Sequence, residues 1–458
     1  DFMNGGKLTD LAGPYAGLKV KVAREKVVED LKKKGLMEKV DESYLHSVTV
    51  CYKCGHDLEP TIMPNWFIKV KGLKEKVKKV VINNDVKFYP TRYKKHMLNW
   101  LEIMHDWPIS RQIVWCIRIP VWYRVDPTAA NIWVWWIDKN KKLQQGNISQ
   151  FINNGISLEE IENGLQKVYA LTGENQPEYV VSDKKPNDGN LYLPETDTFD
   201  TWFSSGQWPL LTLGFPDGQD FKTFYPTQLM ETGRDLIFKW VPRMVIFGMY
   251  LAKKVPFKDI YLHGMVNDEE NQKMSKSKGN VISPINICDE YGADALRMAL
   301  VIGTAPGNDQ ALMKNQIKGY KLFANKIWNI SRYVLSHTDN IDFSVTLTSQ
   351  DQIHHDTWKS ELKKITEGIE DYNLHTASQS IYHYIWDTLA SEILEESKPL
   401  LASDDIMVKK SRQRLLYTLL TESIAVLHPF MPFVTESIWQ LLPHKDKDLL
   451  MISPWPSA

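Results

Sequence analysis

The run Lys273-Met274-Ser275-Lys276-Ser277 combines residue types that bind phosphate. With residues 278–280 (Lys-Gly-Asn) directly after it, the segment is a compact cationic loop. Flexible ammonium groups, hydroxyls and backbone N–H groups suit a substrate that carries several adjacent negative charges, such as a nucleotide triphosphate. The apolar Met274 predicts an anchor buried beneath the loop. A solvated lysine-rich surface loop is the alternative for any such short run, so the surrounding sequence must decide.

Composition limits the classes of function. The 458 residues suffice for two to four domains, and a net charge of −1 means that an anionic partner such as RNA must be met by local patches. The longest apolar stretch, residues 238–251, is broken by Lys239, Pro242 and Arg243, which predicts no membrane span and no membrane partner. Four cysteines favour a reducing compartment, so we expect a cytoplasmic protein.

The first 308 residues have the texture of an α/β fold, in which helical runs alternate with buried strands. Helices are predicted over residues 20–34, 73–81, 158–171 and 235–251. Strands are predicted within residues 47–61, 109–123 and 260–266. Residues 126–194 are mostly polar and are interpreted as an insertion.

Beyond Asn308 the apolar spacing is helical almost throughout. The predicted helices cover residues 313–337, 351–371, 374–397, 408–428 and 431–442. This pattern indicates a separate all-α bundle.

Cys51 and Cys54 have the spacing of a zinc-binding pair, with His56 as a third candidate ligand. A structural zinc ion requires four ligands, and Cys116 and Cys288 stand alone in the sequence. The sequence therefore leaves two interpretations open: a Zn²⁺ site completed from elsewhere, or a tight turn with two thiols.

Residues 310–338 contain basic residues and interleaved aromatic residues without one acidic side chain. Such segregation suits attraction to a phosphate backbone and stacking on bases, although several of the aromatics must pack in the bundle core. The candidate nucleic-acid ligands are Lys314, Lys318, Lys321, Lys326 and Arg332.

Asp235 follows Gly233 and Arg234 at the start of an apolar helix. Its carboxylate either interacts with the helix N-terminus or binds a cationic group in a pocket walled by Trp202. Taken alone, Trp202 is more often a core residue.

Further segments combine with the lysine–serine loop, as residues 273–277 are called below. They are Ile109-Ser110-Arg111-Gln112, Arg118-Ile119-Pro120-Val121-Trp122-Tyr123, Asp200-Thr201-Trp202-Phe203-Ser204-Ser205, Thr232-Gly233-Arg234-Asp235-Leu236-Ile237-Phe238, His263-Gly264, Gly292-Ala293-Asp294-Ala295-Leu296-Arg297, Ala305-Pro306-Gly307-Asn308-Asp309 and His428-Pro429-Phe430-Met431-Pro432-Phe433. In this order they resemble class I aminoacyl-tRNA synthetases of the isoleucine, valine and leucine group, and among these the valyl-tRNA synthetases. The resemblance covers nearly the whole chain and is weakest over residues 126–194.

This resemblance implies a domain order. Residues 1–97 would be the final part of an inserted editing domain, and 98–265 the second half of a Rossmann-type catalytic domain. Residues 266–312 would hold the lysine–serine loop and contact the stem, and 313–458 would form a helical anticodon-binding domain. The family's His-Ile-Gly-His element and most of its editing insertion have no counterpart here. We therefore expect a C-terminal portion that does not complete the reaction alone.

The resemblance also implies roles. ATP with Mg²⁺ would activate valine, and the valyl group would then pass to the 3′ end of tRNA(Val), in an enzyme that acts as a monomer. Lys273 and Lys276 would be catalytic, stabilising the leaving pyrophosphate. The implied ATP-binding residues are His263, Gly264, Met265, Lys273, Met274, Ser275, Lys276 and Ser277. The implied valine-binding residues are Trp202, Asp235 and Leu236.

Three positions depart from the family pattern. Many relatives carry isoleucine where this chain has Leu236, and apolar residues where it has Arg234 and Lys239. Two other functions stay open: an isoleucyl-tRNA synthetase, and a non-catalytic tRNA-binding paralogue. The lysine–serine loop argues against the second, because a pure binder needs no pyrophosphate loop.

Overall fold

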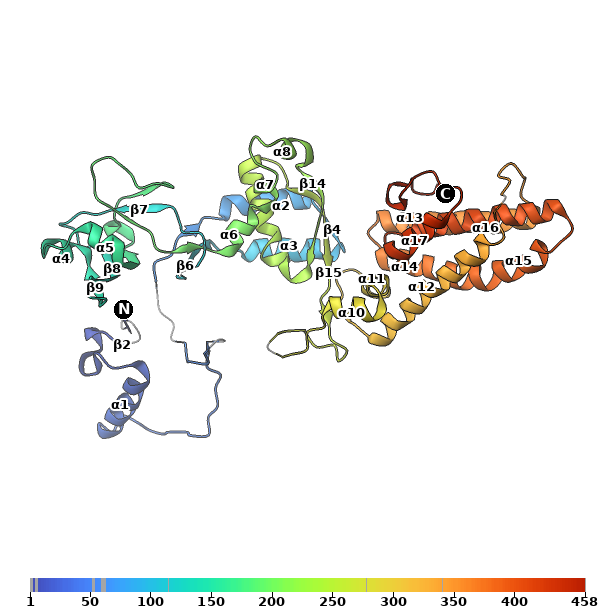
Figure 1. The fold of residues 1–458 in the computed structure, drawn as a ribbon. Helices are drawn as coiled ribbons and strands as arrows, with labels where there is room; N and C mark the ends of the chain where they lie inside the picture. The colour runs from blue at the N-terminus through green and yellow to red at the C-terminus, as the bar shows by residue number, and fades with distance from the viewer. Residues whose placement is uncertain are drawn as a thin grey trace. The chain divides into compact units, whose positions relative to one another are not determined.

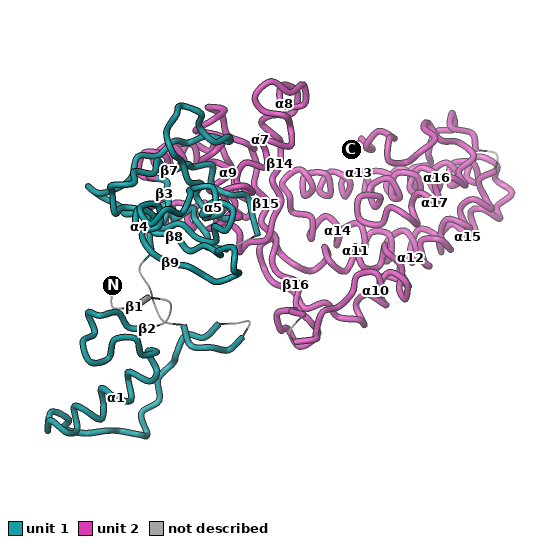
Figure 2. Tube along the Cα trace, turned by 60° about the vertical axis from the view of Figure 1, so that its left-hand side comes forward, with its two compact units in different colours: residues 1–68, 107–200 teal, residues 69–106, 201–458 magenta. Residues whose placement is uncertain are grey.

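A computed structural model describes residues 3–4, 7–51, 54–58, 63–113, 115–276, 278–339 and 341–457 (Figure 1). These residues form two compact units (Figure 2). Unit 1 comprises residues 1–68 and 107–200, and unit 2 comprises residues 69–106 and 201–458. These bounds differ from the domain bounds expected from the resemblance, which stay a prediction.

Unit 1 opens with the β1–β2 pair (Met3–Asn4, Lys7–Leu8), a 3-10 helix (Asp10–Tyr15) and helix α1 (Val20–Lys33). The predicted helix at 20–34 is confirmed. Within 47–61, the described residues contain one isolated bridge, Val50 with Asp57, in place of the predicted strands.

The rest of unit 1 is built from small antiparallel sheets. β3 (Phe67–Ile68) pairs with β5 (Trp107–Pro108), and β6 (Ser110–Arg111) pairs with β13 (Thr198–Phe199). β7 (Val121–Arg124) lies between β11 (Tyr179–Val181) and β12 (Tyr192–Pro194). A third sheet has the order β10-β8-β9 (Leu165–Ala170, Ile132–Ile137, Leu143–Asn147), accompanied by α4 (Ile148–Asn153), α5 (Leu158–Gly164) and a 3-10 turn (Gly173–Asn175).

The prediction of one helix over residues 158–171 was wrong in its second half. Helix α5 ends at Gly164, and residues 165–170 pair with β8 as strand β10. A Cβ at position 164 would lie 2.1 Å from the carbonyl oxygen of Ile137, so glycine lets the helix end pack directly on β8. Residues 126–194 also contribute to a buried core, in which Ile132, Val134 and Trp136 of β8 pack with Val121 and Tyr123 of β7.

The sheet of unit 2 is parallel and has the order β14-β15-β4 (Thr227–Gly233, Phe257–His263, Lys87–Tyr89). Its helices are α2 (Lys71–Ile82), α3 (Arg92–Ile103), α6 (Thr201–Gly206), α7 (Trp208–Leu211), α8 (Gln219–Phe224) and α9 (Val241–Phe247), with a 3-10 helix at Arg234–Phe238 and a π-helix at Gly248–Ala252. The register pairs Gly233 with His263, so β14 and β15 end at the same edge of the sheet. Ligands of α/β proteins bind at this carboxyl edge.

A short parallel pair, β16 (Val266–Asn267) with β17 (Gln310–Ala311), follows β15. Helices α10 (Pro284–Tyr291) and α11 (Ala293–Val301) lie between them in sequence. Ile287, Leu296 and Ile317 join these helices to α12 through a small buried cluster.

The predicted helical bundle is confirmed. It consists of α12 (Lys314–Leu335), α13 (Ser349–Glu370), α14 (Leu374–His383), a π-helix (Tyr384–Ile393), α15 (Leu394–Leu401), α16 (Ile406–Leu427), α17 (Pro432–Leu441) and a 3-10 turn (Leu450–Ile452). Its core is dominated by leucine and isoleucine, with Trp358 fully buried.

Two sequence motifs meet where α11 joins the bundle. The Asp294 carboxylate accepts hydrogen bonds from the N–H groups of Phe433 (3.1 Å) and Val434 (2.7 Å) at the start of α17. Arg297 donates to the carbonyl of Pro429 at 2.8 Å. A carboxylate at a helix N-terminus satisfies otherwise unpaired N–H groups, so these contacts fix α17 against α11.

Among the described residues, no helix is both long enough and apolar enough to cross a membrane.

A buried ion pair in the bundle generates the first prediction. Asp351 and Arg412 lie 2.8 Å apart with side chains 2% and 0% exposed. Removing Asp351 leaves the buried Arg412 with the more distant carboxylate of Glu396, 3.8 Å away. Asp351→Ala should therefore lower the free energy of unfolding by about 3 kcal/mol. Urea unfolding followed by circular dichroism measures this.

Two variants serve as controls. The double change Asp351→Leu with Arg412→Met removes both charges and should recover much of the loss. Asp356→Ala, on the exposed side of α13, should cost less than about 0.5 kcal/mol. Equal stability of Asp351→Ala and Asp356→Ala would contradict the prediction.

Candidate active-site groove

A groove opens at the carboxyl end of the parallel strands of unit 2. Three of the residues expected to bind ligands line it: Asp235 after β14, Met265 after β15, and Lys273 in the lysine–serine loop. The remaining lining residues are Tyr93, His96, Arg234, Phe238, Asn267, Asn271 and Asp309. The structure therefore gathers a carboxylate and an ammonium group from distant parts of the chain at one open site.

The lysine–serine loop is held by a polar network on the N-terminal side of α10. The side chain of Asn280 donates to Asp268 Oδ2 at 2.7 Å and accepts from the Ser275 N–H at 2.9 Å. The Gln272 N–H donates to Asp268 Oδ1 at 2.6 Å. The hydrogen bonds from Asn280 and Gln272 hold the pKa of Asp268 below its ordinary value, so this anchor is ionised at neutral pH.

The apolar and the charged side chains of this loop differ in their exposure. Met274 is half-buried and its sulfur accepts the Ile282 N–H at 3.4 Å, in keeping with the predicted anchor. Lys273, Lys276 and Lys278 are exposed, and none of them forms an ion pair with a described residue. Ser277 lies outside the described residues. The loop thus presents exposed ammonium groups to solvent.

Gly264 lies where the backbone of two segments nearly touches. A Cβ there would be 1.7 Å from the carbonyl oxygen of Asn308 and 2.7 Å from the nitrogen of Asp309. Because these atoms belong to the backbone, a change of side-chain rotamer could not relieve the overlap. Glycine at 264 is therefore required by packing against residues 308–309, a reason that the sequence did not reveal.

Asp309 links this crossing to both ends of the groove. Its Oδ1 accepts the Met265 N–H at 2.7 Å, and its Oδ2 accepts from Arg234 Nη2 at 2.6 Å. Arg234, which departs from the family pattern, is thus paired within unit 2. The sequence contained Asp309 in a matched segment but gave no sign of this role.

Helix α3 clamps the same segment from its other side. Arg92 Nη2 donates to the carbonyl of Pro306 (3.2 Å) and to Asn308 Oδ1 (2.9 Å), and the Tyr93 hydroxyl donates to the carbonyl of Gly307 (3.2 Å). Gly307 has a φ of +77°, and a Cβ there would meet the Tyr93 ring at 2.7 Å. Residues 305–309 are consequently held in one conformation beside the groove.

Other expected ligand-binding residues lie outside the lining of this groove. His263 and Gly264 line a neighbouring hollow with Glu231, whose carboxylate lies 3.2 Å from His263 Nε2. Trp202 and Leu236 are half-buried and line neither space. Their proposed contact with an amino acid stays a prediction.

The basic residues of α12 differ in their surroundings. Lys314, Lys318 and Arg332 are exposed. Lys321 donates to the carbonyl of Glu290 at 2.8 Å, and Lys326 lies 4.0 Å from the centre of the Trp386 ring. Of the interleaved aromatics Phe323 is core and Trp328 is 38% exposed, so this helix presents a face of both charge and ring surface.

The Cys51 segment forms a tight turn. The Gly55 N–H donates to the carbonyl of Cys51, and the Cys51 N–H to the carbonyl of His56, both at 2.8 Å. Within the described ranges, no three His, Cys, Asp or Glu side chains gather to hold a metal ion. Zinc ligation by Cys51 and Cys54 therefore has no support from these residues.

The crossing at Gly264 yields the second prediction. Gly264→Ala should lower the free energy of unfolding by about 1–3 kcal/mol, because the new methyl group overlaps backbone. Gly319→Ala is the matched control: it lies inside α12 with no atom near its added Cβ, and alanine there should stabilise by up to about 1 kcal/mol. Thermal unfolding measures both, and a shift of the same sign for the two variants would contradict the packing argument.

Comparison with known proteins identifies the family of this chain. The family model for tRNA synthetases class I (I, L, M and V) matches residues 16–313, and the anticodon-binding domain of tRNA ligase matches residues 351–458. The valine--tRNA ligases of Petrotoga mobilis and Clostridium tetani are each 37% identical over 98% of this chain. That of Thermotoga maritima is 35% identical over 99%. The chain spans about half the length of these relatives, 47% in each case.

Solved structures share the fold at low identity. Methionyl-tRNA synthetase of Mycobacterium tuberculosis, bound by methionyl-adenylate, superposes with a TM-score of 0.61 at 16% identity, over 87% of this chain and 67% of that one. The LeuRS–tRNA–LeuAMS complex of Agrobacterium radiobacter K84 gives 0.52 at 20% identity, over 77% and 43%. With its α/β sheet, its helical bundle and a family model that matches most of its length, the chain belongs to the class I tRNA synthetases of the I, L, M and V group.

Proposed function

We propose that this chain is part of a valine--tRNA ligase, which activates valine with ATP and transfers it to tRNA(Val). The observation that carries the proposal is the groove where Asp235 and Lys273 face one space at the carboxyl edge of the parallel sheet. The identity of 35–37% to valine--tRNA ligases supports valine as the substrate.

The first step forms valyl-adenylate. The valine carboxylate attacks the α-phosphorus of ATP, a bond to that phosphorus forms, and the bond to the pyrophosphate oxygen breaks. Such a displacement needs positioning and neutralisation of charge more than a nucleophilic side chain. Lys273 and Lys276 are exposed ammonium groups on the loop, and their role is to stabilise the departing pyrophosphate. Met274, Ser275 and Ser277 belong to the same proposed phosphate-binding segment.

The ribose and adenine of ATP are assigned to the end of β15. Both backbone groups of Met265 are occupied, the N–H by Asp309 and the carbonyl by the Gln310 N–H at 3.0 Å. The nucleoside therefore has His263, the surface of Gly264 and the Met265 side chain to contact. A bulky residue at 264 would displace residues 308–309 before it reached the nucleotide.

The amino acid is assigned to Asp235. Its carboxylate is exposed in the groove and forms no ion pair with a described residue, so it is available for the valine ammonium group. Trp202 and Leu236 would bound the isopropyl group. A pocket of this kind excludes isoleucine by size, whereas threonine is rejected only weakly.

The tRNA is assigned to the bundle. Lys314, Lys318 and Arg332 are the exposed cations of α12, and Lys321 and Lys326 lie on the same helix with partners of their own. Mg²⁺ would accompany the ATP phosphates. The described residues offer no carboxylate cluster for it, so no step is derived through the metal.

Two other functions remain in competition. An isoleucyl-tRNA synthetase would show pyrophosphate exchange that prefers isoleucine over valine. A tRNA-binding paralogue would show no exchange with either amino acid. The exposed lysine–serine loop favours an enzyme, since binding tRNA at the bundle does not require it.

The third prediction concerns Lys276. The assay uses a longer protein, in which this chain is joined to the remaining part of the catalytic domain taken from a relative. In that protein, Lys276→Ala should lower valine-dependent ATP–pyrophosphate exchange about 100-fold or more. Affinity for tRNA(Val) should not change, because the proposed tRNA-binding residues lie on α12 and Lys276 is not among them. Filter binding measures the tRNA affinity.

Lys278→Ala is the control within the same loop, and its loss of exchange should be much smaller. Loss of tRNA binding in Lys276→Ala with exchange intact would overturn the assignment. Pyrophosphate exchange that depends on isoleucine and not on valine would show that isoleucine is the substrate.

The fourth prediction concerns Asp235. Asp235→Asn keeps the shape but removes the charge that meets the substrate ammonium group, so KM for valine should rise about 10- to 100-fold. Asp220→Asn, on helix α8 outside the groove, is the control and should leave KM near its original value. A change in KM for ATP rather than for valine would refute the assignment.

A further inference from the structure

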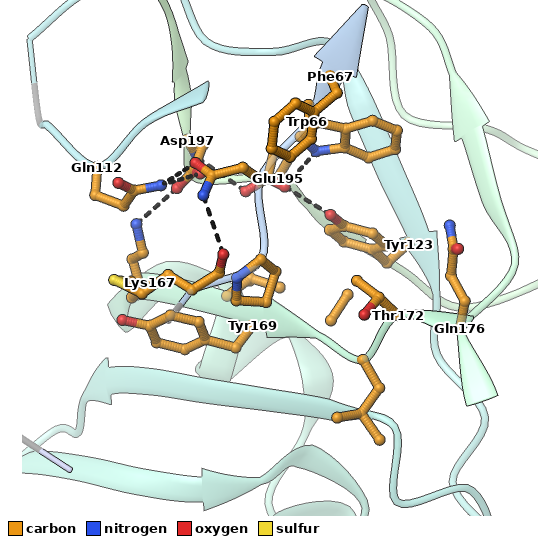
Figure 3. Close-up of a pocket in the computed structure, with 16 residues that line it drawn as sticks. Trp66, Phe67, Gln112, Tyr123, Lys167, Tyr169, Thr172, Gln176, Glu195 and Asp197 are labelled. Carbon is orange, nitrogen blue, oxygen red and sulfur yellow. Dashed lines mark hydrogen bonds and ion pairs between the residues drawn. The ribbon is translucent and has the colours of Figure 1, made fainter. Parts of the chain in front are cut away.

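Unit 1 contains a partly enclosed pocket that shares no residue with the groove of unit 2 (Figure 3). One wall is the extended segment Met63–Phe67, and another is β10 with the two residues after it. The floor carries two carboxyl groups, Glu195 and Asp197, which are 4% and 5% exposed. No feature of the proposed ligase reaction uses this pocket.

Glu195 is held by neutral donors. Its Oε1 accepts the N–H groups of Thr196 (2.6 Å) and Asp197 (2.8 Å), and its Oε2 accepts from Trp66 Nε1 (2.9 Å) and the Tyr123 hydroxyl (2.6 Å). Burial and the neighbouring Glu195 charge raise the pKa of Tyr123, so Tyr123 stays a donor. Both oxygens of Glu195 thus act only as acceptors, and the side chain is held in one orientation among its donors (Figure 3).

Asp197 has a cationic partner. Lys167 Nζ lies 2.6 Å from its Oδ1, and Gln112 Nε2 donates to its Oδ2 at 2.7 Å. Burial raises the pKa of Asp197, against the opposing effect of Lys167. With two carboxyl groups and one ammonium group, the floor of the pocket holds one more acidic than basic side chain.

The walls are aromatic. The rings of Trp66 and Tyr123 stack with centroids 6.4 Å apart, and Tyr169 lines the opposite side. Lys167 already places its ammonium group 5.6 Å from the centre of the Tyr169 ring. Aromatic faces attract cations by their quadrupole, and the attraction grows when water is excluded.

The open edge of β10 adds an acceptor. The Leu171 N–H donates to the carbonyl of Asn131 at 2.9 Å, so the alternation of an antiparallel ladder turns the backbone groups of Ala170 away from β8. In keeping with this, the N–H of Val168 is directed away from β8 to Thr196 Oγ1 at 3.0 Å. The carbonyl of Ala170 therefore faces the side of β10 on which the pocket lies.

We propose that this pocket binds an aliphatic organic cation, a primary ammonium or guanidinium group on a short carbon chain. The aromatic walls accept the chain and the charged head, while the acidic excess of the floor and the Ala170 carbonyl orient the head. A metal ion suits the site poorly, because the Glu195 oxygens are engaged by four donors and the described residues gather no third ligand.

Isothermal titration calorimetry on the whole chain tests the proposal with agmatine and putrescine as probes. n-Butanol and butyrate, which have a similar carbon chain without the positive charge, are the controls. Binding of the two amines with neither control is the expected result. Absence of heat with both amines, or equal binding of butanol, would overturn it.

Variants at an exposed position change the charge near the pocket without disturbing the fold. Gln176 lines the mouth of the pocket and its side chain is exposed, so Gln176→Glu and Gln176→Lys should both fold. Gln176→Glu should tighten amine binding and Gln176→Lys weaken it, each about three- to tenfold at low salt. Equal affinities for the two variants would refute binding of a cation in this pocket.

The aromatic wall has its own test. Tyr169→Leu should weaken amine binding about three- to tenfold, whereas Tyr250→Leu, an exposed tyrosine of unit 2, should leave it unchanged. Loss of affinity in both variants would place the amine elsewhere. Because none of these readouts uses valine, ATP or tRNA, failure here leaves the proposed ligase function untouched.

Discussion

The close approach of Gly264 to residues 308–309 is the constraint on which the rest of unit 2 depends. It lets β16 pair with β17 across a long sequence separation, and Asp309 then holds the Met265 N–H and Arg234 together. A turn then leads from β16 to the lysine–serine loop, whose first residue, Lys273, forms an isolated bridge with Asn267. Its position relative to Asp235 therefore follows from a backbone contact rather than from any property of the loop itself.

A second constraint acts at the other end of the same segment. The Asp294 and Arg297 contacts to the start of α17 couple α11 to the bundle, and α11 packs on α12 through Leu296 and Ile317. The proposed phosphate loop and the proposed tRNA face are thus joined by one continuous set of packed helices. The proposed chemistry depends on charged side chains, but apolar packing and backbone hydrogen bonds determine where those side chains lie.

The sequence predicted well where structure is local. The bundle helices were placed to within a few residues, because their apolar spacing reflects one buried face each. It failed at residues 165–170, where strand formation depends on pairing with β8 about thirty residues earlier. Asp235 and Lys273 were singled out from their types and neighbours; the structure places both in one groove, and their chemical roles stay a prediction. Asp309, Arg92 and Tyr93 were not, because their role exists only once residues 92–93 and 305–309 meet.

The same limit applies more strongly to the pocket of unit 1. Its residues come from five separated stretches between Met63 and Asp197, and only Gln112 and Tyr123 lie in segments that carried the family resemblance. Residues 126–194 resembled the family least, and they supply Lys167, Tyr169 and the open edge of β10. A polar segment that resembles its relatives least can thus contribute one wall of a pocket, since buried polar residues look like surface residues until their partners are known. The two carboxylates of this pocket are satisfied by different means, neutral donors for Glu195 and a lysine for Asp197. That difference, rather than the number of acidic residues, is what leaves one charge to be met by a ligand.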